Sequence, residues 1–226
     1  MNDSRTRSGE VADSFCRFGN FFTHCLGRNA TLVCILLLAS LFHEAAAASP
    51  AYANATWKIL ARGGYVILLR HTVTVPGVGD PPGFVLNNCA TQRNLSADGR
   101  AQAARWRSVV AENSVPIGAV FSSEWCRCVD TATIAFGSAN ATPKRWPALN
   151  SFFESAQNQS AQTVTVKKRL PLLLQEAKKL GNNAVFVTHQ VNITALTGIA
   201  PQSGEAVVIQ LDAQRNISVV GRVLVE

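Results

Sequence analysis

The sequence predicts an α/β protein, a three-layer α/β/α sandwich with a mostly parallel central sheet. Short apolar runs typical of buried strands alternate along the chain with longer segments of helical periodicity. The runs are continuous rather than alternately polar and apolar, which is the pattern of strands covered on both faces. The chain has 226 residues, of which 47% are hydrophobic, and this is enough for one sizeable domain.

Turn and cap signals bound the predicted elements. Ser96 is a candidate N-cap, Gly181 is a natural helix stop, and Pro171 is expected to kink or split the helix in which it lies. The last two strands are expected to form a hairpin at a sheet edge. In order, we predict a strand over 66–69, a long loop over 72–92, a helix from Ser96 to about Asn113, a strand over 119–121, a helix over 125–136 capped by Ser122 or Ser123, an extended segment over 149–153, a helix over 160–180, a strand over 184–187, a helix over 190–197, and strands over 206–211 and 217–225.

Residues 1–53 are typical of a signal peptide and leader. A polar segment with four arginines precedes the apolar residues 30–42, and the small-residue stretch 45–53 follows. This order predicts cleavage after Ala47, Ala48 or Ala53 and leaves a single domain over 54–226. A membrane anchor is the rival interpretation, but thirteen mostly apolar residues fall short of the roughly 20 that span a bilayer. We therefore expect an exported protein, periplasmic or secreted, with no stable membrane span after cleavage.

The charge of residues 54–226 favours an anionic partner. They carry 17 Lys and Arg against 10 Asp and Glu. Such a surplus suits an anionic ligand or surface. No Lys- or Arg-rich run indicates nucleic acid, so a small phosphorylated molecule is the expected partner.

Three cysteines lie beyond the leader: Cys89, Cys126 and Cys128. In an exported chain this number predicts one disulfide and one spare thiol. Cys126 and Cys128 point to different faces if they share a helix, so any bridge uses Cys89. The alternative of a zinc site lacks the usual ligand spacing, and we expect no metal.

Two histidines each end an apolar run, His71 after Arg70 and His189 before a short helix. Buried strands that stop at such residues place them at the carboxyl edge of a sheet, where open α/β folds bind ligands. Arg127 lies in the first turn of its predicted helix, where the helix dipole disfavours a cation and calls for a compensating anion. With the helix amides it could hold a phosphate. The ordinary alternative for Arg70 is an ion pair with an acid such as Asp130.

Four segments, taken in order, resemble the blocks of the histidine phosphatase superfamily, the phosphoglycerate-mutase-like proteins. They are Leu69-Arg-His-Thr72, the stretch from Gln92 to Ala103, the stretch from Ser122 to Ala132, and Val187-Thr-His189. The resemblance runs from about Val66 to Leu211. It implies a phosphohistidine mechanism without metal or organic cofactor. His71 would be the nucleophile, while Arg70, Arg127 and His189 would bind the phosphate.

The chain departs from the usual family pattern at two points. Thr72 stands where relatives have a glycine after the first histidine, and the proton donor is not marked by a motif. By its order in the chain the candidate acid is Glu154, with Glu205 as the alternative, whereas we interpret Glu124 as a charge at a helix N-terminus. A Cys89–Cys126 bridge would tie the long loop to the helix that carries Arg127, and Cys128 would remain free.

The sequence therefore predicts an exported phosphatase that hydrolyses phosphomonoesters, with a sugar phosphate or a phosphorylated envelope component as substrate. The short link between the Arg127 block and His189 favours hydrolysis over phosphoryl migration. The main alternative is a non-catalytic phospholigand-binding protein of the same fold. A phosphatase that acts on phosphohistidine in proteins is a third possibility, but the predicted export is hard to reconcile with such a substrate.

Overall fold

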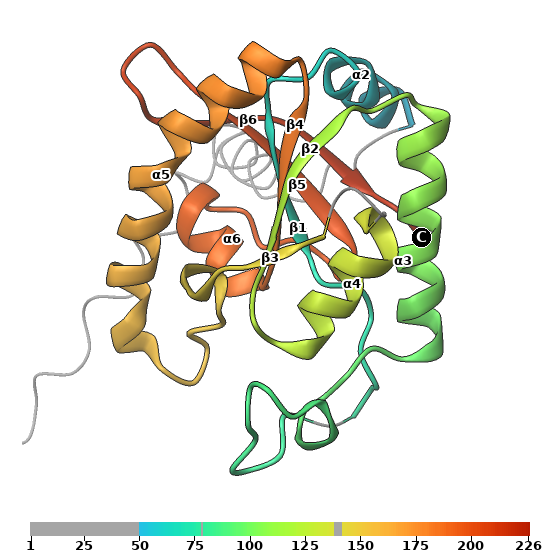
Figure 1. Cartoon of the computed structure of the whole chain (residues 1–226), viewed down its shortest axis with the longest axis vertical. Helices are drawn as coiled ribbons and strands as arrows, with labels where there is room; N and C mark the ends of the chain where they lie inside the picture. Colours follow the sequence, from blue (N-terminus) through green and yellow to red (C-terminus); the bar gives the residue numbers. More distant parts are fainter. Residues whose placement is uncertain (1–49, 78, 138–141) are drawn as a thin grey trace, which may run out of the picture. The chain divides into compact units, whose positions relative to one another are not determined.

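The computed structural model describes residues 50–77, 79–137 and 142–226, so most of the predicted signal segment lies outside the described residues. These described residues belong to one compact unit. Its described part contains five α-helices and six strands (Figure 1). They are α2 (Pro50–Leu60), β1 (Val66–Arg70), α3 (Ala97–Glu112), β2 (Ile117–Ser122), α4 (Cys126–Phe136), β3 (Lys144–Arg145), α5 (Gln159–Leu180), β4 (Asn183–Thr188), α6 (Gln190–Thr197), β5 (Glu205–Leu211) and β6 (Ile217–Leu224).

The six strands form one mixed sheet in the order β3-β2-β4-β1-β5-β6. Strands β3, β2, β4 and β1 are parallel, whereas β5 is antiparallel to both β1 and β6. The predicted mostly parallel sheet and the hairpin at its edge are therefore confirmed. In the register, Leu69 and Ser122 both lie opposite Val187, so the carboxyl ends of β1, β2 and β4 meet at one edge.

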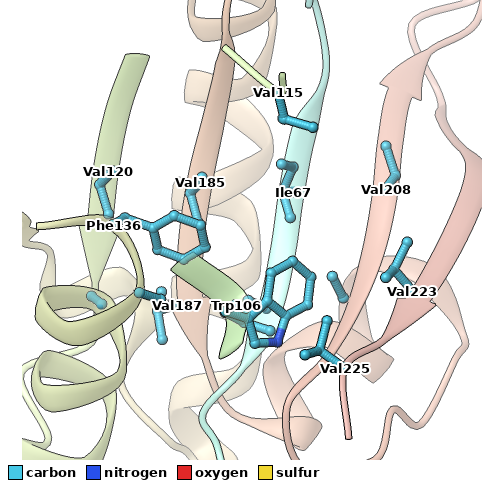
Figure 2. Packing of buried hydrophobic residues seen from close by; sticks show 14 of the residues in the cluster. Ile67, Trp106, Val115, Val120, Phe136, Val185, Val187, Val208, Val223 and Val225 are labelled. Carbon is cyan, nitrogen blue, oxygen red and sulfur yellow. The ribbon is translucent and has the colours of Figure 1, made fainter. Parts of the chain in front are cut away.

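Helices cover both faces of the sheet, which confirms the three layers. Helices α2, α3 and α4 lie on one side and α5 and α6 on the other (Figure 1). The first interface is a buried cluster around Ile67, Trp106 and Val185, shown in Figure 2. A second buried cluster around Leu68, Leu170 and Phe186 fills the interface on the other face of the sheet. No helix within the described ranges is both long and apolar enough to cross a bilayer.

One local prediction was wrong, and one of the two alternatives for Pro171, a split helix, is excluded. The segment 149–153 forms no strand: Pro147–Leu149 is a 3-10 turn, and the pairing with β2 occurs earlier, at Lys144–Arg145. The apolar signal of this segment comes from Leu149, which packs against the α5 layer rather than into the sheet. Pro171 does not split α5, which runs unbroken for 22 residues because its neighbours Leu170, Leu173 and Leu174 are buried on one stripe.

Helix α2 begins at Pro50, ahead of the predicted domain start at residue 54. Its Thr56 and Leu60 are buried, so the helix is an integral part of the compact unit. Cleavage after Ala47 or Ala48 would leave this helix whole, whereas cleavage after Ala53 would remove its first turn. The boundary itself stays a prediction.

Candidate active site

A pocket of about 340 Å³ opens at the edge where β1, β2 and β4 end. The four residues predicted to act on phosphate, Arg70, His71, Arg127 and His189, all line it. Each of them directly ends or follows a strand, or lies in the first turn of a helix after one. The structure thus brings together side chains that are up to 119 positions apart in the sequence.

His71 is buried, and its surroundings hold it in one form. Its Nδ1 lies 2.9 Å from the carbonyl oxygen of Thr72. Burial, followed by the positive charge of Arg127, lowers the pKa of His71 from 6.5 to about 3. The ring is therefore neutral near neutral pH. Because a carbonyl can only accept, the ring proton sits on Nδ1 and the lone pair on Nε2.

Thr72, the departure from the family pattern, anchors this arrangement. It is fully buried, its backbone N–H donates to Oγ1 of Thr131 at 3.1 Å, and the two hydroxyl oxygens lie 3.1 Å apart. Oγ1 of Thr131 in turn donates to the carbonyl oxygen of Arg127 at 2.7 Å. A threonine therefore fits at position 72. Its carbonyl oxygen orients His71, and its hydroxyl contacts Thr131 and so links this carbonyl to helix α4.

The backbone around His71 is also fixed by two glycines. The N–H of Gly204 donates to the carbonyl oxygens of Arg70 and His71 at 3.3 and 3.2 Å, and Gly204 has a left-handed φ of 75°. A Cβ at Gly99 would lie 1.8 Å from the carbonyl oxygen of Val73. Both positions allow a close approach that a side chain would prevent.

The arginines of the pocket are only partly satisfied. Arg70 donates from Nη1 to the carbonyl oxygen of Pro201 at 2.8 Å. It does not pair with Asp130, which binds Arg100 at 2.8 Å. The Nε atoms of Arg70 and Arg127 are buried and have no hydrogen-bond partner among the described residues. Burial and the charges of Arg93 and Arg127 lower the pKa of Arg70. Buried like charges of this kind call for an anion.

His189 lies against His71 with 5.4 Å between the ring centroids. Its Nε2 is 3.0 Å from Oγ of Ser123, which donates to Oδ1 of Asn150 at 3.0 Å. Burial, and then the neighbouring charges, hold the pKa of His189 well below its usual value. The ring is therefore neutral near neutral pH and is fixed in orientation by Ser123.

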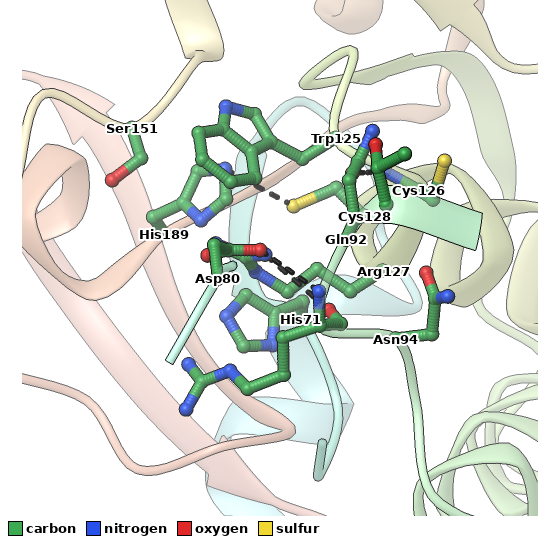
Figure 3. Close-up of polar contacts among 12 residues, drawn as sticks. His71, Asp80, Gln92, Asn94, Trp125, Cys126, Arg127, Cys128, Ser151 and His189 are labelled. Atoms are coloured by element: carbon green, nitrogen blue, oxygen red, sulfur yellow. Dashed lines mark hydrogen bonds and ion pairs between the residues drawn. The ribbon is translucent and has the colours of Figure 1, made fainter. Parts of the chain in front are cut away.

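Sequence reasoning missed the anion that compensates Arg127. Oδ1 of Asp80 lies 3.0 Å from Nη1 of Arg127, and both side chains are almost fully buried (Figure 3). The Arg127 guanidinium also stacks on Trp125, 4.3 Å from its centroid. Asp80 is the only acid within residues 72–92, which is the signal that could have found it. Arg93, a further pocket residue, follows Gln92 in one of the family-like segments but was not predicted for the site.

The predicted start of helix α4 needs correction. Neither Ser122 nor Ser123 caps it: the N-cap is Trp125, without a side-chain hydrogen bond. Instead, the backbone N–H of Cys126 donates to Oε1 of Gln92 at 2.9 Å (Figure 3). This amide is therefore occupied by the long loop and is not open to a phosphate.

The three glutamates considered from the sequence lie in different surroundings. Glu154 is exposed and lines the pocket. Glu205 is buried outside the pocket lining, where its carboxylate binds Arg222 at 2.7 Å and accepts from the N–H of Gln202 at 2.8 Å. Both of its oxygens are thus engaged in structural contacts. Glu124 precedes α4 and accepts a hydrogen bond from Asn150.

The predicted disulfide is confirmed: Cys89 is bonded to Cys126, and Cys128 is a buried free thiol. Burial raises the pKa of Cys128 to about 12, so the thiol stays neutral. Its Sγ lies 3.4 Å from Nε2 of His189. Over the parts of the chain that the structure describes, no group of three His, Cys, Asp or Glu side chains is placed to hold a metal ion.

Comparison with known proteins agrees with this geometry. A family model described as histidine phosphatase superfamily, branch 1, matches residues 66–162. No curated protein is significantly similar in sequence. Similar solved structures include a mycobacterial hydrolase 1, with 15% identity, TM-score 0.54 and coverage of 73% of this chain and 99% of that one. A mycobacterial glucosyl-3-phosphoglycerate phosphatase complexed with VO₃ has 14% identity, TM-score 0.51 and coverage of 70% and 97%.

The α-ribazole phosphatase from Shigella flexneri is 19% identical, with TM-score 0.50 and coverage of 72% of this chain and 96% of that one. At these identities the structural likeness shows a shared fold. The family model adds a sequence match that starts at β1 and includes the blocks of His71 and Arg127. Residues 66–162 therefore match the histidine phosphatase superfamily in sequence, and the described part of the chain shares the fold of these solved structures.

Proposed function

We propose that this protein is an exported phosphatase that hydrolyses phosphomonoesters through a phosphohistidine intermediate on His71. The observation that carries the proposal is the neutral, oriented ring of His71. Its Nδ1 proton is engaged by the Thr72 carbonyl, which leaves the Nε2 lone pair as a nucleophile. This ring lines the same pocket as Arg70, Arg93 and Arg127.

The reaction has two steps. Nε2 of His71 attacks phosphorus, the ester P–O bond breaks, and the leaving oxygen takes a proton from an acid. Water then attacks the phosphohistidine, the P–N bond breaks with its electron pair returning to Nε2, and phosphate leaves. The arginines and His189 would bind the equatorial oxygens, on which charge is concentrated during transfer.

Three observations support the proposed substrate and location. A pocket of about 340 Å³ suits a small phosphorylated molecule such as a sugar phosphate or an envelope component. One structural relative is named for glucosyl-3-phosphoglycerate. The Cys89–Cys126 disulfide favours an oxidising compartment, which agrees with export.

The test compares wild type with His71→Ala on a chromogenic aryl phosphate, a substrate that needs little help from an acid. We expect turnover by the wild type, loss of turnover by His71→Ala, and a transient phosphoenzyme that survives alkaline quenching as phosphohistidine. His71→Ala should still bind inorganic phosphate through the arginines, which controls for its folding. Equal turnover by the variant would remove His71 as nucleophile. Phosphate binding without wild-type turnover would favour the non-catalytic binding protein.

A further inference from the structure

No sequence motif marks the acid that protonates the leaving group, and the assignment of a residue to this role rests on the proposed phosphatase activity. We propose that Asp80 is the proton donor to the leaving-group oxygen. The structure places this side chain, which is 8% exposed, in the lining of the pocket that contains His71 and His189. Figure 3 shows its carboxylate directed at Arg127 among these side chains.

Asp80 stands where a phosphate oxygen would bind. Its Oδ1 accepts hydrogen bonds from Nη1 of Arg127 at 3.0 Å and from the backbone N–H of Arg93 at 2.9 Å. A phosphate bound by Arg127 must therefore meet this carboxylate. Two adjacent anions repel each other, and the repulsion is relieved when the carboxylate takes up a proton. Substrate binding thus converts the counter-ion of Arg127 into an acid beside the reacting phosphate.

The other carboxylates fit this role less well. Among the described residues that line the pocket, the only acids are Asp80 and Glu154. Glu154 is exposed and faces water at the rim. Glu205 is outside the lining and is bound by Arg222. Only Asp80 is both enclosed and in contact with an arginine proposed to bind phosphate.

The loop that carries Asp80 is fixed to helix α4, which carries Arg127. The Cys89–Cys126 disulfide and the hydrogen bond from Cys126 N–H to Gln92 both join this loop to the start of α4, next to Arg127. A proton donor must be held within hydrogen-bond reach of the leaving oxygen. Two cross-links within 12 positions of Asp80 provide that constraint.

The proton balance closes over the two steps. As the ester P–O bond breaks, its electron pair goes to the leaving oxygen, which takes the proton from the Asp80 carboxyl and departs as the alcohol. The resulting carboxylate then accepts a proton from the water that attacks the phosphohistidine. Release of phosphate restores the neutral His71, and the Asp80 proton is lost as its contact with Arg127 re-forms.

The test measures how activity depends on the leaving group. Wild type, Asp80→Asn and Glu154→Gln are compared on p-nitrophenyl phosphate, phenyl phosphate and glycerol phosphate. We expect Asp80→Asn to lose at most a few-fold on p-nitrophenyl phosphate but roughly 10²–10³-fold on the substrates with poor leaving groups. Asp98→Asn is the matched control: it is exposed in the first turn of α3, outside this pocket, and should follow the wild type on all three.

Other outcomes would overturn the assignment. If Asp80→Asn loses activity equally on all three substrates, or on none, Asp80 is a counter-ion and not an acid. If Glu154→Gln shows the steep dependence, the rim glutamate is the donor. Asp80→Glu keeps a carboxyl group. It should recover activity on the substrates with poor leaving groups if that carboxyl still reaches the leaving oxygen. If the wild type turns over none of the three substrates, the proposed function itself is wrong. If Asp80→Asn is active and its activity depends on the leaving group as that of the wild type does, only the role of Asp80 is wrong.

Discussion

The ring of His71 is oriented by a series of contacts that ends on another element. The Thr72 carbonyl holds Nδ1, Thr131 holds Thr72, and Thr131 also binds the backbone of Arg127. The proposed nucleophile and one of the proposed phosphate ligands are therefore positioned by the same hydroxyl. A residue that touches no substrate can affect catalysis in this way, because small displacements of a nucleophile cost rate.

We expect Thr131→Val to lower kcat roughly 10- to 100-fold with a much smaller change in KM. The substitution keeps the side-chain volume but leaves the N–H of Thr72 without its acceptor and the His71 ring without a fixed carbonyl. Steady-state kinetics on an aryl phosphate measure the effect. Thr131→Ser retains the hydroxyl and should restore most of the rate. If valine and serine behave alike, hydrogen bonding by Thr131 does not position His71.

Helix α4 and the loop over 72–92 act together at the scale of elements. The first turn of α4 supplies Cys126 and Arg127, while the loop supplies Cys89 and Asp80. The disulfide therefore holds the two partners of a buried ion pair in reach of each other. A break in this bridge should affect both stability and activity.

We expect Cys89→Ser to destabilise the fold by about 4 kcal/mol, the chain-entropy value for a closed loop of 37 residues. Its kcat/KM should also fall about ten-fold or more, since Asp80 and Arg127 lose their fixed separation. Urea unfolding and aryl phosphate kinetics measure the two effects. A reductant should bring the wild type to the level of the variant and leave Cys89→Ser unchanged. A variant as stable and as active as the wild type would show that the bridge constrains neither.

The sequence predicts elements where a periodic pattern exists and fails where contacts are set by tertiary packing. Helix α6 and strand β4 are marked by periodicity and bounded by His189, and their predicted and observed limits agree within one residue. Asp80 lies in a loop without any pattern, and its contact with Arg127 joins positions 47 residues apart. Burial of leucines outweighed the helix-breaking tendency of Pro171 for the same reason: the deciding contacts come from another layer.

At the scale of the whole molecule, the topology of the sheet creates the site. Strands β1 and β4 are adjacent and parallel, with Arg70 opposite Thr188, so His71 and His189 emerge side by side. Both rings are buried there, each with 4% of its surface exposed. Their neutral form is thus a consequence of the fold, and it links the stability of the protein to pH.

The pH dependence follows from the difference between the folded and unfolded pKa of His71. The unfolded chain binds a proton near pH 6.5, whereas the folded ring resists protonation until about pH 3. As pH falls below 6.5 the unfolded state therefore gains protons that the folded state does not, and stability decreases until pH approaches 3. His189, whose pKa is also lowered, acts in the same direction.

We expect His71→Gln to reduce the loss of stability between pH 6.5 and pH 5.0 by about 1.5 kcal/mol. Glutamine cannot titrate, so the unfolded variant does not bind the proton that His71 binds in the unfolded wild type. His189 and all carboxylates remain in both proteins. Urea unfolding at the two pH values gives the difference for each protein, and any change in absolute stability caused by the substitution cancels. Equal losses in the two proteins would mean that folded His71 takes up a proton as readily as the unfolded chain. It would then be cationic in mildly acidic solution and unable to attack phosphorus there.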